Sequence, residues 1–283
     1  MKPPDLDDGI AAEVAGVGSR YRLRLGAQRF RGRTGARRGH GVGSSQEFFD
    51  FRDYTPGDDL RYLDWRGYAR TEQLRIRLHQ EEVAPYVDVL VDTSASLAST
   101  PGKQRAARTL AAALERWSHR EGSTARVLAL GGGPLDAAAL QFGGGDGAPD
   151  LPDLPELPRL PLRPGGVRVL LSDGLWQKDP TPLLHGVCAG AGRVFCLQLL
   201  DPWELDPAAE GALLLIDCER GERAEVQLDA RTIAAYRGRL QRLIDGMRTT
   251  VIAQGGTFAL VSADSLAAMC ARDLLPAAVV EPA

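Results

Sequence analysis

Three oxygen-bearing side chains, Asp92, Ser94 and Ser96, occupy alternate positions in one short stretch of the sequence. A carboxylate and two hydroxyls are hard oxygen donors, and Mg²⁺ prefers such ligands in an octahedral arrangement. The stretch follows a short, nearly continuous apolar run at residues 87–91, which is typical of a strand buried on both faces of a parallel sheet. We therefore expect residues 92–96, called the site loop below, to lie just past the carboxyl end of a buried strand.

A second strand-like run, at residues 167–171, is followed by Ser172, Asp173 and Gly174. In open α/β sheets, ligands bind at the carboxyl ends of the strands. If the strands follow the order 3-2-1-4-5-6, the two runs are neighbours, and their terminal carboxylates meet in one crevice. The sequence therefore predicts a magnesium site whose metal ligands are four oxygen-bearing residues: Asp92, Ser94, Ser96 and Asp173.

Strand patterns and helix patterns alternate along the rest of the chain. This alternation predicts an α/β fold with a doubly wound, mostly parallel sheet and right-handed crossovers. Thr100 and Pro101 form a helix-start signal before an apolar stripe of helical spacing. Asp229 caps a longer helix, and residues 213–216 and 224–228 flank a turn that predicts an inserted β-hairpin.

Six prolines recur at every third position from Pro149 to Pro164. Polyproline II has three residues per turn, so the prolines share one edge of such a helix and the leucines share a second edge. Proline at this density cannot sustain an α-helix. We expect an extended strap whose leucine edge lies on the domain, and a docking peptide for a proline-binding partner is the alternative.

The chain before the main domain divides into two parts. We expect residues 1–19 to form a loose tail and residues 20–82 to form an N-terminal β-rich extension of the α/β domain at residues 83–283. Apolar residues alternate with arginines at residues 21–25, which is typical of a half-buried strand. A further strand is expected at residues 74–78, before the strand that leads to the site loop.

Residues 41–70 are dense in aromatic residues and in charges of both signs. One interpretation is a structural network of salt bridges that fixes this segment against the main domain. The other is a partner-docking surface, because aromatic and arginine side chains dominate interface hot spots. The candidate partner-binding residues are Arg52, Tyr54, Asp58, Asp59, Arg61, Asp64, Trp65 and Arg70.

Composition and charge argue against several classes of protein. The formal net charge of -3 argues against a general nucleic-acid-binding protein, so we expect no nucleic-acid partner. No apolar run approaches the roughly 20 residues of a membrane span, and the acidic start of the chain lacks the apolar core of a signal peptide. The four cysteines form no CxxC pair, which favours reduced thiols. We therefore expect a cytoplasmic protein.

The site loop, Asp92-Thr93-Ser94-Ala95-Ser96, resembles the DxSxS metal-ion-dependent adhesion motif of von Willebrand factor A domains. The upstream block resembles the bacterial domain-of-unknown-function family fifty-eight, whose domain is A-like. The residues that carry this second resemblance are Glu47-Phe48, Arg52-Asp53-Tyr54, Pro56-Gly57-Asp58-Asp59, Arg61, Asp64-Trp65 and Ala69-Arg70, and Asp201-Pro202-Trp203-Glu204 also fits. Together these motifs imply a fold of von Willebrand factor A type.

Proteins of this family are thought to act as non-enzymatic partners of MoxR-type AAA+ ATPases in the assembly or activation of a client protein. The resemblance implies that the site-loop side chains are metal ligands and that Asp173 acts directly or through water. An open coordination position would then take a carboxylate from the partner. The A-domain pattern also takes a threonine from a loop between the two motifs, and no threonine occurs from Ala125 to Ser172.

A phosphatase or phosphotransferase with Asp92 as nucleophile is the alternative function, because an aspartate after a buried strand also suits covalent phosphoryl chemistry. That chemistry commonly uses a second carboxylate two residues later, where this chain has Ser94. A serine hydrolase would need a G-x-S-x-G turn, which is missing around Ser94 and Ser96. Lys103 is the one lysine near this strand end. We therefore expect a binding module rather than an enzyme.

Overall fold

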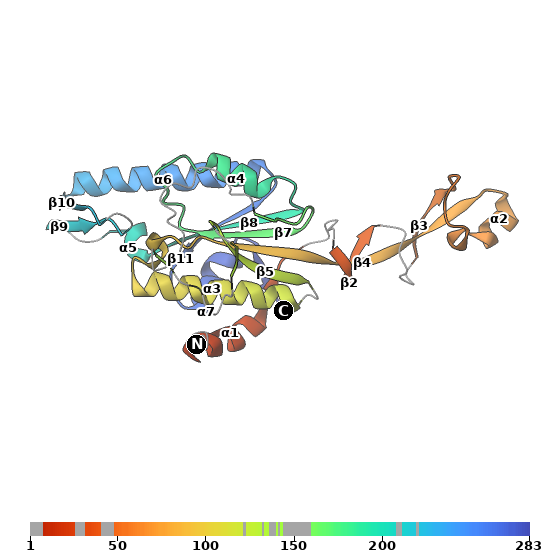
Figure 1. Cartoon of the computed structure of the whole chain (residues 1–283), viewed down its shortest axis with the longest axis horizontal. Helices are drawn as coiled ribbons and strands as arrows, with labels where there is room; N and C mark the ends of the chain where they lie inside the picture. Colours follow the sequence, from red (N-terminus) through yellow and green to blue (C-terminus); the bar gives the residue numbers. More distant parts are fainter. Residues whose placement is uncertain are drawn as a thin grey trace.

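The main body is a mostly parallel sheet with helices on both faces (Figure 1). The computed structural model describes residues 8–25, 32–40, 48–120, 123–131, 133–135, 140, 142–143, 160–207, 211–218 and 221–283. Across the sheet, the strands are β11 (Thr257–Ser262), β8 (Arg193–Leu200), β7 (Val167–Ser172), β4 (Arg75–Val91), β5 (Thr124–Ala129) and β6 (Pro134–Leu135). All neighbours are parallel except β5 and β6. Numbered in chain order from β4 and followed from β6, these strands have the order 3-2-1-4-5-6, which confirms the predicted α/β fold.

Helices cover both faces of this sheet, because its central strands are apolar on both sides. One face carries α3 (Pro101–Arg120), α1 (Asp8–Gly16) and α7 (Leu266–Met269), and the other carries α4 (Thr181–Cys188) and α6 (Ala230–Ala253). Val87, Val89 and Val91 of β4 join the core cluster under α3, whereas Leu90 joins the cluster under α4 and α6. Among the described helices, none is both long and apolar enough to cross a membrane.

The predicted helix starts and the predicted hairpin are present. The backbone N–H of Lys103 donates to Thr100 Oγ1 at 3.1 Å at the start of α3. The backbone N–H of Thr232 donates to Asp229 Oδ1 at 2.6 Å at the start of α6. The hairpin consists of β9 (Gly211–Ile216) paired antiparallel with β10 (Arg223–Leu228).

The N-terminal segment differs from the expected loose tail. Its α1 helix buries Ile10 and Val14, which lie one turn apart, in the core cluster under α3. The indole Nε1 of Trp117 donates to the carbonyl oxygen of Gly18 at 2.8 Å. The tail prediction is therefore wrong for the helix, because a place for its two apolar side chains exists only in the folded body. Residues 1–7 lie outside the described residues.

The predicted half-buried strand at residues 21–25 is present as β1 (Tyr21–Leu23). It pairs antiparallel with β12 (Val280–Pro282), close to the end of the chain. Leu23 and Leu25 are fully buried, while Arg22 and Arg24, which alternate with them, are exposed. This strand is therefore part of the main body and not of the N-terminal extension.

Strand β4 is continuous over 17 residues, so the separate strand expected at residues 74–78 is wrong. Polar residues at 79–82 interrupt the apolar pattern, but backbone pairing with neighbouring strands continues through them. The first part of β4 pairs with β2 (Gly32–His40) and β3 (Phe48–Asp53) and forms an arm that extends from the body (Figure 1). The far end carries η2 (Leu60–Tyr62) and α2 (Trp65–Thr71). We call residues 51–76 the arm tip.

The proline-rich run lies outside the described residues from 149 to 159, so the predicted strap is not tested there. At the end of the run, Leu160 and Leu162 pack against the core cluster under α4 and α6. The backbone N–H of Arg163 donates to Asp88 Oδ2 at 2.9 Å, and Arg126 Nε donates to Asp88 Oδ1 at 2.6 Å. The described end of this crossover is therefore fixed to the last part of β4, at Asp88.

Candidate functional site at the carboxyl ends of β4 and β7

The site loop leaves β4 at the carboxyl edge of the sheet. Its first residue, Asp92, donates its backbone N–H to the carbonyl oxygen of Leu171 in β7 at 2.9 Å. Asp92 and Ser94 are buried, Ser96 is half-buried, and the loop continues into the short helix η3 (Ala95–Ala98). The loop is thus held against the end of β7, where Asp173 follows.

A glycine makes the turn after Asp173 possible. Gly174 has a φ of +70°, and a Cβ at this position would lie 2.6 Å from Met247 Sδ. Its backbone N–H donates to Ser172 Oγ at 2.9 Å, and the next N–H, of Leu175, donates to Asp173 Oδ1 at 3.1 Å. The positive φ favours glycine at this position, and the hydrogen bonds of the turn hold the Asp173 carboxylate in place.

Both carboxylate oxygens of Asp92 accept hydrogen bonds from neutral donors. Oδ1 accepts from the backbone N–H of Ser94 at 2.9 Å. Oδ2 accepts from Ser172 Oγ at 2.6 Å and from Trp176 Nε1 at 3.1 Å. The sequence did not identify Ser172 or Trp176 as partners, because no local pattern links them to a residue 80 or more positions earlier.

Burial is the main influence on the protonation of Asp92. It raises the pKa of this carboxyl above its usual value, and the nearby charge of Asp173 raises it further. The hydrogen bonds from Ser172 and Ser94 act in the opposite direction but do not cancel the rise in pKa. The site therefore disfavours a second negative charge beside Asp173.

The two serine hydroxyls of the site loop face each other. Ser94 Oγ and Ser96 Oγ lie 2.9 Å apart and share a hydrogen bond. Two neighbouring ligands of an octahedral Mg²⁺, each about 2.1 Å from the ion, lie about 3 Å apart. The spacing of these hydroxyls therefore suits a shared ligand.

Asp173 forms an ion pair with a lysine of helix α3. Lys103, in the first turn of α3, lies with its Nζ 3.0 Å from Asp173 Oδ2 and 2.8 Å from Glu204 Oε1. The lysine side chain is fully buried, and so is almost all of the Asp173 side chain. Glu204 lies in the short helix α5 (Pro202–Leu205), so one ammonium joins three elements.

Lys103 keeps its charge in this environment. Burial alone would lower the pKa of the ammonium, but Asp173 and Glu204 together outweigh that effect and raise its pKa above the usual value. A buried ammonium with two carboxylate partners stays protonated across the neutral pH range. The buried cluster of Asp92, Lys103, Asp173 and Glu204, called the crevice below, thus contains a permanent positive charge.

The residues present fit only part of the predicted magnesium site. The serine hydroxyls have the spacing of metal ligands, but Asp173 binds an ammonium and Asp92 has both oxygens occupied by hydrogen-bond donors. Within the described residues, no group of three or more His, Cys, Asp or Glu side chains is placed to hold a metal ion. The four-ligand arrangement is therefore not formed as these side chains lie, and magnesium binding stays a prediction.

The charged residues of the arm tip pair with one another. Arg52 binds Asp58 through two hydrogen bonds of 2.5 and 2.7 Å, and the hydrogen bond from this arginine lowers the pKa of Asp58. Arg61 binds Asp59 in the same manner, at 2.5 Å. The partners lie two and six positions apart, and α2 lies far from the main sheet (Figure 1). These ion pairs therefore do not fix the segment against the main domain, and that interpretation is wrong for them.

The arm tip exposes apolar side chains beside these pairs. Leu60 and Trp65 are 54% and 58% exposed, and Tyr68 is 40% exposed. The Trp65 and Tyr68 rings meet edge-on, with centroids 6.5 Å apart. Of the other candidate partner-binding residues, Arg70 is exposed, Tyr54 is half-buried and Asp64 is buried at the start of α2. Asp64 is therefore a structural residue of the tip, whereas the aromatic pair is accessible.

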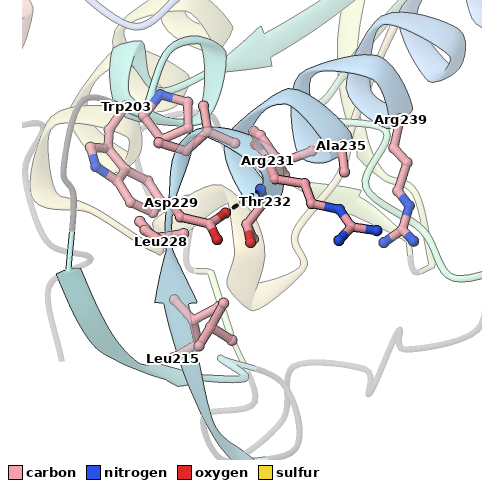
Figure 2. Close-up of a pocket in the computed structure, with 12 residues that line it drawn as sticks. Trp203, Leu215, Leu228, Asp229, Arg231, Thr232, Ala235 and Arg239 are labelled. Atoms are coloured by element: carbon pink, nitrogen blue, oxygen red, sulfur yellow. Dashed lines mark hydrogen bonds between the residues drawn. The ribbon is translucent and has the colours of Figure 1, made fainter.

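A hollow lies between α5, the β9–β10 hairpin and the start of α6 (Figure 2). It has a volume of about 660 Å³. Trp203 and Leu228 line one side, Leu215 of the hairpin lies below them, and Arg231 and Arg239 extend along the other side. The hollow and the Lys103 cluster use neighbouring residues of the chain, because Trp203 lines the hollow and the next residue, Glu204, binds Lys103. Its lining is mostly apolar.

Comparison with known proteins finds a family match for one part of the chain. Residues 50–135 match the family described as "Protein of unknown function DUF58". Two uncharacterized proteins, from Mycobacterium bovis (strain ATCC BAA-935 / AF2122/97) and Mycobacterium tuberculosis (strain ATCC 25618 / H37Rv), are each 27% identical over 231 residues, and the match covers 72% of this chain and 73% of theirs.

A solved structure, of an aerotolerance-related membrane protein from Bacteroides fragilis NCTC 9343 with multiple mutations to serines, is also similar. It is 13% identical, with a TM-score of 0.27, and the match covers 58% of this chain and 99% of that one.

The DUF58 match confirms the family resemblance seen in the sequence, and its extent separates the site into two parts. It runs through the arm tip, β4, the site loop and α3, so Asp92 and Lys103 lie inside it. Asp173 and Glu204, the two partners of Lys103, lie beyond its end. The matched segment thus supplies the ammonium, and the part of the chain that follows it supplies the carboxylates that bind it.

Proposed function

We propose that this chain is a non-enzymatic protein-binding module that works with a MoxR-type AAA+ ATPase in the assembly or activation of a client protein. The observation that carries this proposal is the arm tip, where exposed aromatic side chains stand at one end of β4 while the site loop stands at the other. The resemblance of both segments to the DUF58 family supports the choice of an ATPase as the partner. The match over residues 50–135 covers the two segments together.

The composition of the arm tip supports a docking role. Trp, Tyr and Arg are the residue types most enriched in interface hot spots, and the tip exposes all three. Its arginines Arg52 and Arg61 already have carboxylate partners, so they hold the local shape and leave Trp65, Tyr68 and Leu60 as the accessible apolar surface. A partner would bury this surface.

The environment of Asp92 supports binding over phosphoryl transfer. A nucleophilic carboxylate must present a free oxygen to its substrate. Asp92 is fully buried, and both of its oxygens accept hydrogen bonds within the crevice. Ser94, two residues later, hydrogen-bonds Ser96 and supplies no carboxylic acid. These contacts give the phosphotransferase alternative no support.

The test measures the affinity of the purified chain for a MoxR-type ATPase from the same organism, by biolayer interferometry. Trp65→Ala is expected to weaken binding about tenfold or more, the effect of removing a hot-spot residue. Ile252→Ala is the control, because Ile252 is an exposed apolar residue of α6 with an exposed fraction of 56%, close to that of Trp65. Equal affinity of the two variants would contradict the docking role of the tip, and no binding of the wild-type chain would contradict the choice of partner.

A further inference from the structure

The crevice under the site loop already contains a cation, the ammonium of Lys103. The whole sequence has 34 basic residues, of which the lysines are Lys2, Lys103 and Lys178. In a chain whose basic residues are mostly arginine, the buried position between two carboxylates has a lysine. An ammonium is a compact point charge with three donors, whereas a guanidinium is a wide planar fork, so lysine suits a small three-element junction.

Each carboxylate of this junction is held at both oxygens. Asp173 accepts from Lys103 with Oδ2 and from the backbone N–H of Leu175 with Oδ1, at 3.0 and 3.1 Å. Glu204 accepts from Lys103 with Oε1 and from the backbone N–H of Asp201 with Oε2, at 2.8 and 2.7 Å. The lysine therefore meets two carboxylates whose positions the backbone already fixes.

The backbone of Lys103 is fixed as well. Thr100, which caps α3, donates its hydroxyl to Asp201 Oδ2 at 2.7 Å and accepts the backbone N–H of Lys103. The start of α3 and the start of α5 are thus joined twice, once through this threonine and once through the lysine and Glu204. The Lys103 side chain is fully buried, so its ammonium cannot exchange these carboxylates for water.

A divalent ion at Asp173 would compete with this ammonium. Positive charges a few ångströms apart in a buried site repel each other strongly, since the surroundings screen charge much less than water does. The ion would have to displace Lys103 from Asp173 and leave a buried lysine with one carboxylate partner fewer. The same ion would also have to break the hydrogen bonds that Asp92 accepts.

We propose that Lys103 is the resident cation of this site, and that its ammonium takes the place at Asp173 that a divalent ion would occupy. The crevice then keeps its shape without magnesium, and the serine pair of the site loop stays free of metal. Removal of the ammonium charge exposes Asp173 and Glu204 to each other and creates a site for a divalent ion. This inference does not depend on which protein the arm tip binds.

The experiment is a titration with Mn²⁺ followed by electron paramagnetic resonance and calorimetry. The wild-type chain is expected to show no saturable binding at millimolar Mn²⁺, and its melting temperature is expected to be the same with Mg²⁺ and with a chelator. Lys103→Met, which keeps the length of the side chain without its charge, is expected to bind Mn²⁺ at least tenfold more tightly than wild type. Its melting temperature should then rise with added Mg²⁺.

The control is Lys178→Met, which removes an exposed lysine five residues after Asp173 and should behave as wild type. Saturable micromolar binding of Mn²⁺ by the wild-type chain would overturn the proposal, and so would a Lys103→Met variant that folds without any gain in binding. If Lys103→Met does not fold, the wild-type titration still decides the outcome. The double variant Lys103→Met/Asp173→Asn, which removes both charges, should then recover folding without recovering ion binding.

Discussion

The arm tip and the crevice use the same kind of ion pair in opposite ways. At the tip, the Arg61 and Asp59 side chains are 83% and 40% exposed, and each can exchange its partner for water. In the crevice, the Lys103 and Asp173 side chains are 0% and 1% exposed, and neither can. An exposed pair contributes little to stability, whereas breaking a buried pair leaves a charge without compensation. The tip is therefore free to change on contact with a partner, and the crevice is not.

The largest expected effect follows from breaking the buried pair. Lys103→Met leaves two carboxylates facing each other, and we expect it to lower the free energy of unfolding by about 3–5 kcal/mol, the usual cost of an uncompensated buried charge. Urea denaturation followed by circular dichroism measures this change. Arg61→Ala at the tip is the matched control and should leave the unfolding midpoint unchanged. Similar losses in both variants would remove the contrast between the two regions.

A smaller effect is expected from the neutral donors around Asp92. Ser172→Ala removes the hydroxyl that donates to Asp92 at 2.6 Å and accepts from Gly174, so we expect a loss of about 1–3 kcal/mol in the free energy of unfolding. Ser19→Ala is the control, because that hydroxyl donates to the Gly16 carbonyl at an exposed position. An effect of Ser172→Ala no larger than that of the control would mean that the Asp92 hydrogen bonds do not hold the crevice.

The smallest effect is a difference in pH dependence. Because the pKa of Asp92 is raised in the folded state, the folded protein keeps a proton that the unfolded chain releases above its ordinary value of about 3.9. The contribution of Asp92 to stability therefore falls as the pH rises above that value. The pKa values of Asp58 and Asp59 at the tip are lowered, so their contributions are lost as the pH falls.

Asp92→Asn tests this sign. The difference in unfolding free energy between the variant and wild type should move in favour of the variant as the pH rises from about 4 to about 7, on top of a constant offset from changed hydrogen bonds. Asp58→Asn should show the opposite trend. Urea denaturation at several pH values measures both. A difference that does not vary with pH for Asp92→Asn would show that its carboxyl titrates alike in the folded and unfolded chain.

Much of the fold was predictable because its signals are local. Apolar runs predicted the central strands, Thr100 and Asp229 predicted two helix starts, and the order rule for parallel sheets placed the ends of β4 and β7 side by side. A β-rich extension was expected at residues 20–82, but the continuity of β4 from this extension into the main sheet was missed, because backbone pairing continues β4 through a polar stretch that carries no strand pattern. The α1 helix was missed, because its two buried side chains depend on a surface of α3 that the tail sequence does not describe.

The candidate site divides in the same way. The site loop was predictable because the alternation of its oxygen-bearing side chains is a property of five consecutive residues. The partners of Asp92 were not, since Ser172 and Trp176 meet it only when β7 lies beside β4. The assignment of Asp173 as a metal ligand followed from its place at a strand end, and that place gives no information about a lysine on the other side of the crevice.

The sequence by itself determined which segment could hold a ligand: an aspartate and two serines after one buried strand, with a second aspartate after another buried strand. Only the tertiary structure decided which cation lies there. Lys103 meets Glu204 across 101 positions of sequence because the starts of α3 and α5 converge on the end of β7. The partners of a buried charge are the residues that folding brings next to it. The spacing of residues along the chain does not predict which residues these are.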